Sequence, residues 1–186
     1  MTQQKIVLAA YSNFAEHGYS GGSLAQIAEE VGIRKQSIYT YFKSKDDLYL
    51  SISQDAMQTE LAFMKGFIEQ QQEQEVEQML YLLLRAAQQR FLQQLSTKFF
   101  IRSTFITPPH LEKQLLEQTY FYLDSLEAIL KHFFAKQQIA VSPTIAASSF
   151  LALLDSLYVE MLYGGEARFE KRLEAGWKVF YRGITN

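Results

Sequence analysis

Apolar residues recur at intervals of three and four positions along nearly the whole chain, which is the spacing of one face of an α-helix. No segment shows a convincing alternation of apolar and polar residues, the mark of a half-buried strand. Three prolines and nine glycines cluster at a few points between the periodic segments, where they predict turns. The pattern therefore predicts an all-α protein.

Composition excludes several classes of site. The chain has 186 residues, no cysteine and a formal net charge of −2. Without cysteine there can be no disulfide, no thiolate metal ligand and no cysteine nucleophile. The three histidines lie on different predicted helices without metal-ligand spacing, so we expect no metal and no cofactor. No apolar run appears long enough for a signal peptide or a membrane span, which predicts a cytoplasmic protein without a membrane partner.

Glycine and capping residues divide the start of the chain into short helices. Gly18 stands where a left-handed residue would end the first helix, and Gly32 permits the tight turn that precedes the third. Ser23 followed by Gln26 has the pattern of a capping box at the start of the second helix. The first four helices are expected at residues 2–17, 23–31, 35–41 and 44–68.

The third predicted helix separates an apolar side from a polar side. At about 100° per residue, Ile38 and Phe42 point inward. The opposite side carries side chains of the kind that read base edges and phosphates: Gln36, Ser37, Tyr39 and Thr40. Cations surround them at Arg34, Lys35, Lys43 and Lys45. One interpretation is an ordinary amphipathic helix with a solvated face. The capped helix and glycine turn before it instead indicate a helix-turn-helix that docks in the major groove of DNA.

The same segment carries a dense set of residues at characteristic positions: Ala9, Ala10, Phe14, Gly18, Tyr19, Ser23, Ile27, Ala28, Gly32, Lys35, Ser37, Ile38, Tyr39, Tyr41, Phe42, Ser44, Lys45 and Leu48. On these residues, the stretch from Ile6 to Leu48 resembles the DNA-binding domain of the TetR family of bacterial transcriptional regulators. The resemblance implies that Lys35, Ser37, Tyr39, Tyr41 and Lys45 contact DNA, mostly its phosphates, and that Ser23 helps to seat the first turn of the second helix on the DNA backbone. The full set of candidate DNA-binding residues is therefore Ser23, Arg34, Lys35, Gln36, Ser37, Tyr39, Thr40, Tyr41, Lys43 and Lys45.

Two positions depart from the pattern of that family. Gly22 replaces a threonine that commonly precedes Ser23, which would remove one phosphate contact. Arg34 stands where a capping serine is frequent, and the lost cap together with the unfavourable helix dipole costs about 1 kcal/mol. Either Arg34 offsets this loss of stability by contacting DNA, or it is a tolerated surface residue.

The remaining chain is predicted to form a larger C-terminal helical domain. We expect the helix-turn-helix domain at residues 1–47 and the second domain at residues 48–186, joined through a shared helix. The family resemblance implies that the second domain dimerises through its last two long helices and encloses an effector cavity. Further helices are expected at residues 76–95, 98–105, 108–136, 142–164 and 166–182.

The last two helices are too apolar for the surface of a lone monomer. Two copies of this pair could form a four-helix bundle about a two-fold axis, which predicts a homodimer. The alternative is that the same residues fill the core of one chain. The candidate interface residues are Phe150, Leu154, Leu157, Tyr158, Met161, Leu173, Trp177 and Phe180.

The helices between residues 48 and 136 are rich in aromatic residues. They predict either an aromatic-lined pocket for an apolar or amphipathic small molecule, or plain core packing. The candidate pocket residues are Phe63, Phe67, Tyr81, Phe91, Phe100, Phe105, Tyr120 and Tyr122. Candidate polar anchors are Arg85, Arg90, Arg102, His110 and Glu117, and Asp155 is either a pocket or interface acid or an exposed residue.

These features together favour a DNA-binding transcriptional regulator. We expect a repressor that binds a palindromic double-stranded DNA operator as a homodimer. An unidentified small-molecule effector would release it by favouring a different dimer geometry. The alternatives are a helical adaptor that binds proteins instead of DNA, and an enzyme that uses the C-terminal cavity. No glycine-rich phosphate loop or G-x-S-x-G motif supports the enzyme, so we expect no catalytic residues.

Overall fold

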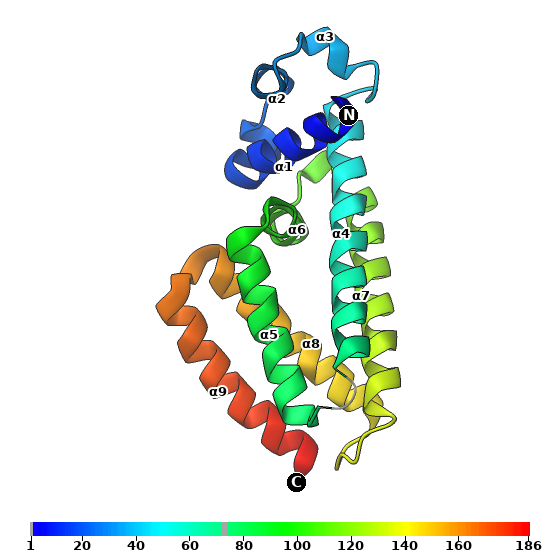
Figure 1. Cartoon of the computed structure of the whole chain (residues 1–186), viewed down its shortest axis with the longest axis vertical. Coiled ribbons are helices and arrows are strands. Elements are labelled where there is room, and N and C mark those ends of the chain that lie inside the picture. Colours follow the sequence, from blue (N-terminus) through cyan, green and yellow to red (C-terminus); the bar gives the residue numbers. More distant parts are fainter. Residues whose placement is uncertain (1, 72–73) are drawn as a thin grey trace. The chain divides into compact units, whose positions relative to one another are not determined.

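The structure is a computed structural model that describes residues 2–71 and 74–186. Within these ranges every regular element is helical, which confirms the predicted all-α class, with a helix-turn-helix near the N-terminus (Figure 1). The elements are α1 (Thr2–Gly21), α2 (Leu24–Val31), α3 (Lys35–Ile38), α4 (Lys45–Gln70), α5 (Val76–Gln93), α6 (Leu95–Phe105), η1 (Pro109–Leu111), α7 (Glu112–Phe134), α8 (Pro143–Val159), η2 (Glu160–Gly164) and α9 (Gly165–Thr185). Of the two shorter elements, η1 is a 3₁₀ turn and η2 is a π-helical turn.

The chain forms two compact units. The head unit comprises Met1–Glu60 and Leu92–Phe121, and the body unit comprises Leu61–Phe91 and Tyr122–Asn186. Helices α4, α5 and α7 contribute residues to both. The helix-turn-helix is thus one part of a unit that also contains α6, η1 and the start of α7, and the division expected at residue 48 lies inside that unit.

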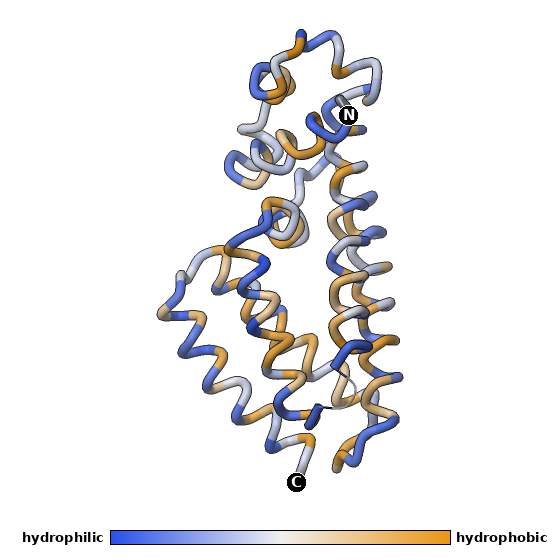
Figure 2. Tube along the Cα trace, viewed as in Figure 1, coloured by the Kyte–Doolittle hydropathy of each residue, from blue (hydrophilic) through white to orange (hydrophobic). Residues whose placement is uncertain are grey.

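An aromatic cluster forms the core of the head unit. Phe14 of α1 lies 5.1 Å from Tyr49 of α4 and 6.4 Å from Phe99 of α6, measured between ring centroids. All three side chains are buried. Complete burial of such a side chain contributes about 1.5–3 kcal/mol, so α6 is held firmly against α1 and α4. Figure 2 shows that hydrophobic and hydrophilic residues are interspersed along the helices.

The end of α1 differs from the predicted one. Gly18 has a φ of 67°, a left-handed value that interrupts the helix where a stop was expected. The chain then resumes one helical turn to Gly21, with the Gly22 N–H donating to the Gly18 carbonyl at 3.0 Å. The interruption places Tyr19 beside α4, where its ring packs against Tyr49 at 5.2 Å.

The predicted capping box at α2 is wrong. Ser23 does cap the helix, since its Oγ accepts from the Ala25 N–H at 3.2 Å. The backbone N–H of Ser23, however, donates to Oδ1 of Asn13 in α1 at 3.0 Å, and Gln26 instead accepts from the Asn13 amide at 3.2 Å. A residue on a neighbouring helix therefore takes the role that the pattern assigned to Gln26.

Helix α3 is shorter than expected, because its last residues form tighter turns. The helix proper spans Lys35–Ile38, whereas residues 35–41 were predicted. The backbone N–H of Tyr41 donates to the Ile38 carbonyl at 2.9 Å, three residues back. This spacing is that of a 3₁₀ turn. The buried side of α3 is nevertheless the predicted one, since Ile38 and Phe42 are both buried.

Helix α8 belongs to the body unit and buries Phe150, Leu154 and Leu157. The stretch Pro143–Thr185 contains a window that is apolar and long enough to cross a membrane, which contradicts the expectation that no window would be. Half of that window is buried inside the structure, as in the core helix of a globular domain. Burial against neighbouring helices therefore explains the apolar composition of this window without a membrane.

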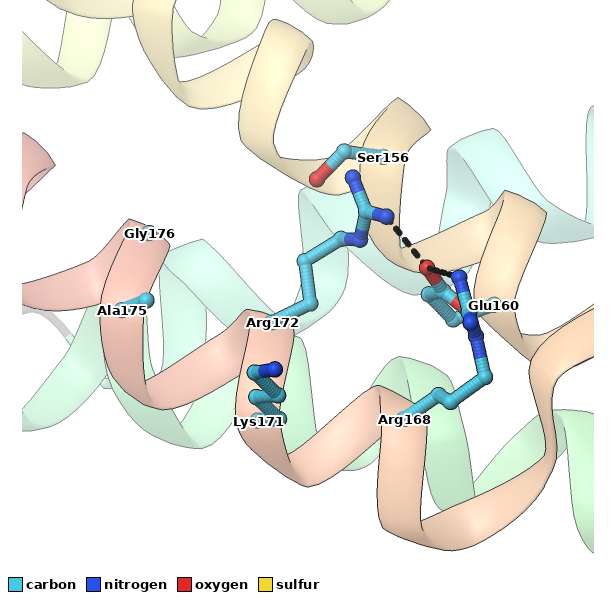
Figure 3. A pocket seen from close by; sticks show the side chains of 7 residues that line it. All are labelled: Ser156, Glu160, Arg168, Lys171, Arg172, Ala175 and Gly176. Carbon is cyan, nitrogen blue, oxygen red and sulfur yellow. Dashed lines mark hydrogen bonds and ion pairs between the residues drawn. The ribbon is translucent and has the colours of Figure 1, made fainter.

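A buried carboxylate joins α9 to the π-helical turn after α8 (Figure 3). Glu160 is 3% exposed and accepts from Arg168 Nε at 2.9 Å, while Arg172 donates to its other oxygen. The hydrogen bond from Arg168 is the largest cause holding the pKa of Glu160 below its ordinary value. These two arginines and Glu160 line a cavity of about 480 Å³ together with Ser156, Lys171, Ala175 and Gly176.

The predicted interface residues fill the interior of the body unit. Trp177 is half-buried, and the other seven are buried within one chain: Phe150, Leu154, Leu157, Tyr158, Met161, Leu173 and Phe180. Within a single chain these residues thus have the surroundings of core residues, which is the alternative interpretation. The other side of the same helices exposes apolar residues, with Ile145 56% and Val179 74% exposed. Both line a groove of about 570 Å³ between α8 and α9.

Candidate nucleic-acid interface

The outward side of α3 and of the turn that follows it carries the predicted polar side chains. Tyr39 is 50% and Tyr41 is 42% exposed, because burial of Ile38 and Phe42 turns the intervening residues outward. The exposed residues of this segment are Lys35, Gln36, Tyr39, Thr40, Tyr41 and Lys43, and Ser37 is half-buried. Donors and acceptors on an exposed short helix can enter a groove of DNA without rearrangement of the core.

A concavity of about 480 Å³ collects five of the ten predicted residues. Its lining comprises Gly22, Ser23, Leu24, Lys35, Tyr39, Lys43, Ser44 and Lys45. Three of these side chains are cations, while the start of α2 and the start of α4 meet at its edge. Helix starts present backbone N–H groups and a partial positive charge. A phosphate oxygen at this concavity could therefore contact lysine ammonium groups as well as backbone N–H groups.

Two hydrogen bonds from backbone N–H groups to side chains hold the first turn of α4. The Asp47 N–H donates to Ser44 Oγ at 3.0 Å, and the Lys43 N–H donates to Asp47 Oδ2 at 2.8 Å. These bonds fix the chain on both sides of Ser44. They therefore set the directions in which Lys43 and Lys45 leave the backbone.

Lys45 lies against an aromatic surface. Its Nζ is 4.3 Å from the centroid of the Tyr19 ring and 5.9 Å from that of Phe14. A cation over the face of an aromatic ring is attracted by the ring quadrupole. Burial lowers the pKa of Lys45, and the neighbouring Asp46 carboxylate opposes that shift.

Tyr19, Asp46 and His110 form a polar cluster next to Lys45. The Tyr19 hydroxyl donates to Asp46 Oδ1, and His110 Nε2 lies 3.2 Å from that hydroxyl and 3.4 Å from the same carboxylate oxygen. Burial and the bond to Asp46 raise the pKa of Tyr19 to about 12. The bond from Tyr19 is the largest cause lowering the pKa of Asp46. His110 contacts Tyr19 and Asp46 of the matched segment, and its role as an anchor for an effector stays a prediction.

The two departures from the family pattern have different structural settings. A Cβ added to Gly22 would lie 2.5 Å from the Phe14 ring and 2.7 Å from Asn13 Oδ1, so the site has no room for a threonine. Arg34 is exposed, and its side chain makes no capping hydrogen bond at the start of α3. Arg34 therefore does not cap α3, and its two interpretations differ only in a contact with DNA.

The predicted pocket residues are divided between the two units. In the head unit Phe100 is buried, whereas Phe105 is 39% and Tyr120 is 60% exposed. In the body unit Tyr122 is buried, and the others are half-buried: Phe63, Phe67, Tyr81 and Phe91. Their role as an effector site remains a prediction.

The other candidate polar anchors lie in several settings. The guanidinium of Arg90 lies over the Phe63 ring at 4.2 Å, and Arg85 donates to Glu170 of α9. Asp155 is partly buried, which raises the pKa of its carboxyl. Arg102 of α6 lies against Gly18, and Glu117 of α7 is exposed.

Residues 6–52 match the family described as bacterial regulatory proteins, tetR family. The chain is 36% identical to the HTH-type transcriptional regulator RutR of Escherichia coli over 67 residues, which are 36% of this chain and 32% of RutR. It is 32% identical over 71 residues to the HTH-type transcriptional repressor AcnR of Corynebacterium diphtheriae, covering 37% of each chain. The chain thus matches only about a third of the length of these relatives.

The likeness extends further in three dimensions. The transcriptional regulator FadR from Bacillus subtilis, solved in complex with stearoyl-CoA, superposes with a TM-score of 0.70 at 19% identity. The superposition covers 98% of this chain and 99% of FadR. At this identity the likeness shows the shared fold. The sequence match to the tetR family of bacterial regulatory proteins thus covers residues 6–52, and the likeness of the rest of the chain is one of fold.

Proposed function

We propose that the chain is a transcriptional regulator that binds double-stranded DNA through α2, α3 and the start of α4. The observation that carries the proposal is the concavity in which Ser23, Lys35, Tyr39, Lys43 and Lys45 converge beside the exposed side of α3. Such a surface offers cations and helix starts to the phosphates while polar side chains face the bases. The matched relatives are regulators, and AcnR is a repressor, which supports repression as the mode of action.

A homodimer would place two such surfaces on one operator. Each single head unit offers a small cationic area, so affinity would depend on binding two half-sites at once. The exposed side of α8 and α9, with Ile145 and Val179, is the surface we assign to the contact. A two-fold dimer would then bind a palindrome with half-sites about 34–36 Å apart, or a multiple of that spacing.

An apolar or amphipathic small molecule would control release from the operator. Half-buried aromatic side chains in the body unit support a ligand of this class, as does the FadR complex with stearoyl-CoA. Such a ligand must bind one dimer geometry better than the other, because equal affinity would shift nothing. The protein would act in the bacterial cytoplasm, where its DNA target lies, and we assign it no catalytic role.

Selection of bound fragments from random duplex DNA tests this function. The expected product is a palindrome, and Lys35→Ala and Tyr39→Ala should weaken binding to it. Lys35→Ala should also reduce the slope of log affinity against log salt by about one contact. Lys65→Ala is the matched control, since Lys65 is an exposed cation of the body unit that pairs with Glu69 and does not line the concavity. If no DNA is retained even in low salt, the chain is an adaptor for other proteins and the proposal fails.

A further inference from the structure

His110 contacts the DNA-binding region although it lies outside the matched segment of residues 6–52. It belongs to η1, the short turn between α6 and α7, and its neighbour Leu111 is buried in the head unit. The imidazole packs edge-on against the Tyr19 ring with 4.9 Å between centroids. Its Nε2 reaches both the Tyr19 hydroxyl and the Asp46 carboxylate. Three segments distant in sequence thus meet at one side chain.

The two partners of His110 are also the groups that surround Lys45. The Tyr19 ring forms the surface under Lys45 Nζ, and Asp46 follows Lys45 directly in α4. Lys45 in turn lines the concavity assigned to phosphate. A displacement of Tyr19 or Asp46 would therefore move a cation at the DNA surface. His110 holds both partners from an element other than their own helices.

We propose that His110 is a positioning residue for DNA binding, which orients Lys45 by holding Tyr19 and Asp46. The inference rests on the proposed DNA-binding function and extends the machinery for it beyond the helix-turn-helix. His110 itself need not touch DNA. Its effect passes through the aromatic surface and the carboxylate beside Lys45.

The charge of His110 matters because the cluster contains a carboxylate. Histidine changes charge between about pH 5 and pH 8, and its protonated form pairs with Asp46. That pair neutralises a negative charge which would otherwise repel phosphate next to Lys45. DNA therefore favours protonated His110, and affinity should rise as pH falls. The titratable groups that contact His110 are Tyr19 on α1 and Asp46 on α4, and the Tyr19 ring is in turn contacted by Lys45 and Tyr49 of α4.

The experiment measures operator affinity at about pH 6 and about pH 8 for the full chain and three variants. Wild type should bind about three- to tenfold more tightly at the lower pH, as expected for one added charge near phosphates. In His110→Gln an amide can still donate to Asp46 but cannot titrate. This variant should match wild type at the higher pH and lose most of the pH dependence. His110→Ala also lacks the titrating group, so it should bind about three- to tenfold more weakly than wild type at the higher pH, and the difference from wild type should be larger still at the lower pH.

His17→Gln is the control for general effects of histidine charge, because His17 is exposed at the end of α1 and lies near Glu16. It should keep the wild-type pH profile. Far-UV circular dichroism and thermal midpoints confirm that each variant is folded. If wild type binds DNA but His110→Gln keeps the full pH dependence, or His110→Ala binds as wild type does, the inference about His110 is overturned. If wild type itself binds no DNA, the proposed function fails first.

Discussion

The side chain of Asn13 accepts the backbone N–H of Ser23 at 3.0 Å, so one helix of the head unit caps the next. Asn13 is 8% exposed, and its amide also donates to Gln26 at 3.2 Å. The bond sets the angle between α1 and α2 at the point where Ser23 reaches the proposed phosphate concavity. Folding of the head unit and the geometry of the proposed DNA surface thus depend on the same contact.

Asn13→Ala should destabilise the protein by about 1–2 kcal/mol, because it leaves the Ser23 N–H without its partner. Gln26→Ala is the control, since Gln26 is exposed and water can replace it as the acceptor for the Asn13 amide. Its loss should therefore cost less than about 0.5 kcal/mol. Urea unfolding followed by circular dichroism measures both. Equal losses in the two variants would mean that the bond to Gln26 is as important as the Asn13 cap, which would contradict the smaller role expected for Gln26.

Gly22→Ala should also destabilise the head unit. The added Cβ would lie 2.5 Å from the Phe14 ring and 2.7 Å from Asn13 Oδ1, and the buried ring cannot move aside freely. Overpacking of this kind costs about 1–3 kcal/mol. Gly66→Ala in α4 is the matched control, because nothing lies within 4 Å of a Cβ added there. Alanine at that position should stabilise the helix by about 0.5–1 kcal/mol. The thermal midpoint should therefore fall in Gly22→Ala and rise in Gly66→Ala. An unchanged midpoint in Gly22→Ala would refute the steric reason.

How far the sequence predicts this structure depends on the kind of contact. Helices follow from apolar periodicity, which is local, and the buried side of α3 follows from the positions of Ile38 and Phe42 alone. The Asn13 cap and the His110 cluster join residues 10 to 91 positions apart, and no local pattern marks polar partners at such separations. Polar side chains of this type are common on any helix surface, so only the tertiary fold selects them.

The interface prediction shows a second limit. Apolar residues such as Phe150 and Leu154 repeat at helical spacing, but the spacing does not reveal whether their partner is the same chain or another copy. Glu160 shows a third limit, since it is a charged residue buried at a π-helical turn that breaks the regular period. A helical pattern would place such a carboxylate on the surface, and its burial depends on Arg168 and Arg172 from α9.

Glu160→Gln should weaken the link between η2 and α9 and flatten the acid dependence of stability. The pKa of Glu160 is lowered in the folded chain. A lowered carboxyl pKa contributes stability above the unfolded value of about 4.3, and this contribution is lost as pH falls through the folded value. Urea midpoints of wild type should therefore drop more steeply on acidification than those of Glu160→Gln. Glu174→Gln, at an exposed position of α9, should keep the wild-type slope.

Val179→Asp should convert the proposed homodimer into a folded monomer. Val179 is 74% exposed in one chain, so the charge adds no strain to the body unit, but it would be buried unpaired in a contact through α8 and α9. Sedimentation equilibrium should show the mass of one chain, and operator affinity should fall because avidity is lost. Leu92→Asp, at an exposed position of α5, serves as control and should remain dimeric. A dimeric Val179→Asp would place the contact elsewhere.

Arg34→Ala separates the two interpretations of the missing cap. Arg34 is exposed before α3, and its side chain makes no capping bond there. If Arg34 contacts operator phosphate, its removal should weaken binding and lower the salt slope by about one contact, while unfolding stability changes by less than about 0.5 kcal/mol. Arg34→Ser should restore a cap and raise stability by about 1 kcal/mol, yet bind DNA as weakly as Arg34→Ala. Unchanged affinity and slope in both variants would identify Arg34 as a surface residue. The two substitutions differ only in capping, so together they assign any change to the helix or to the DNA.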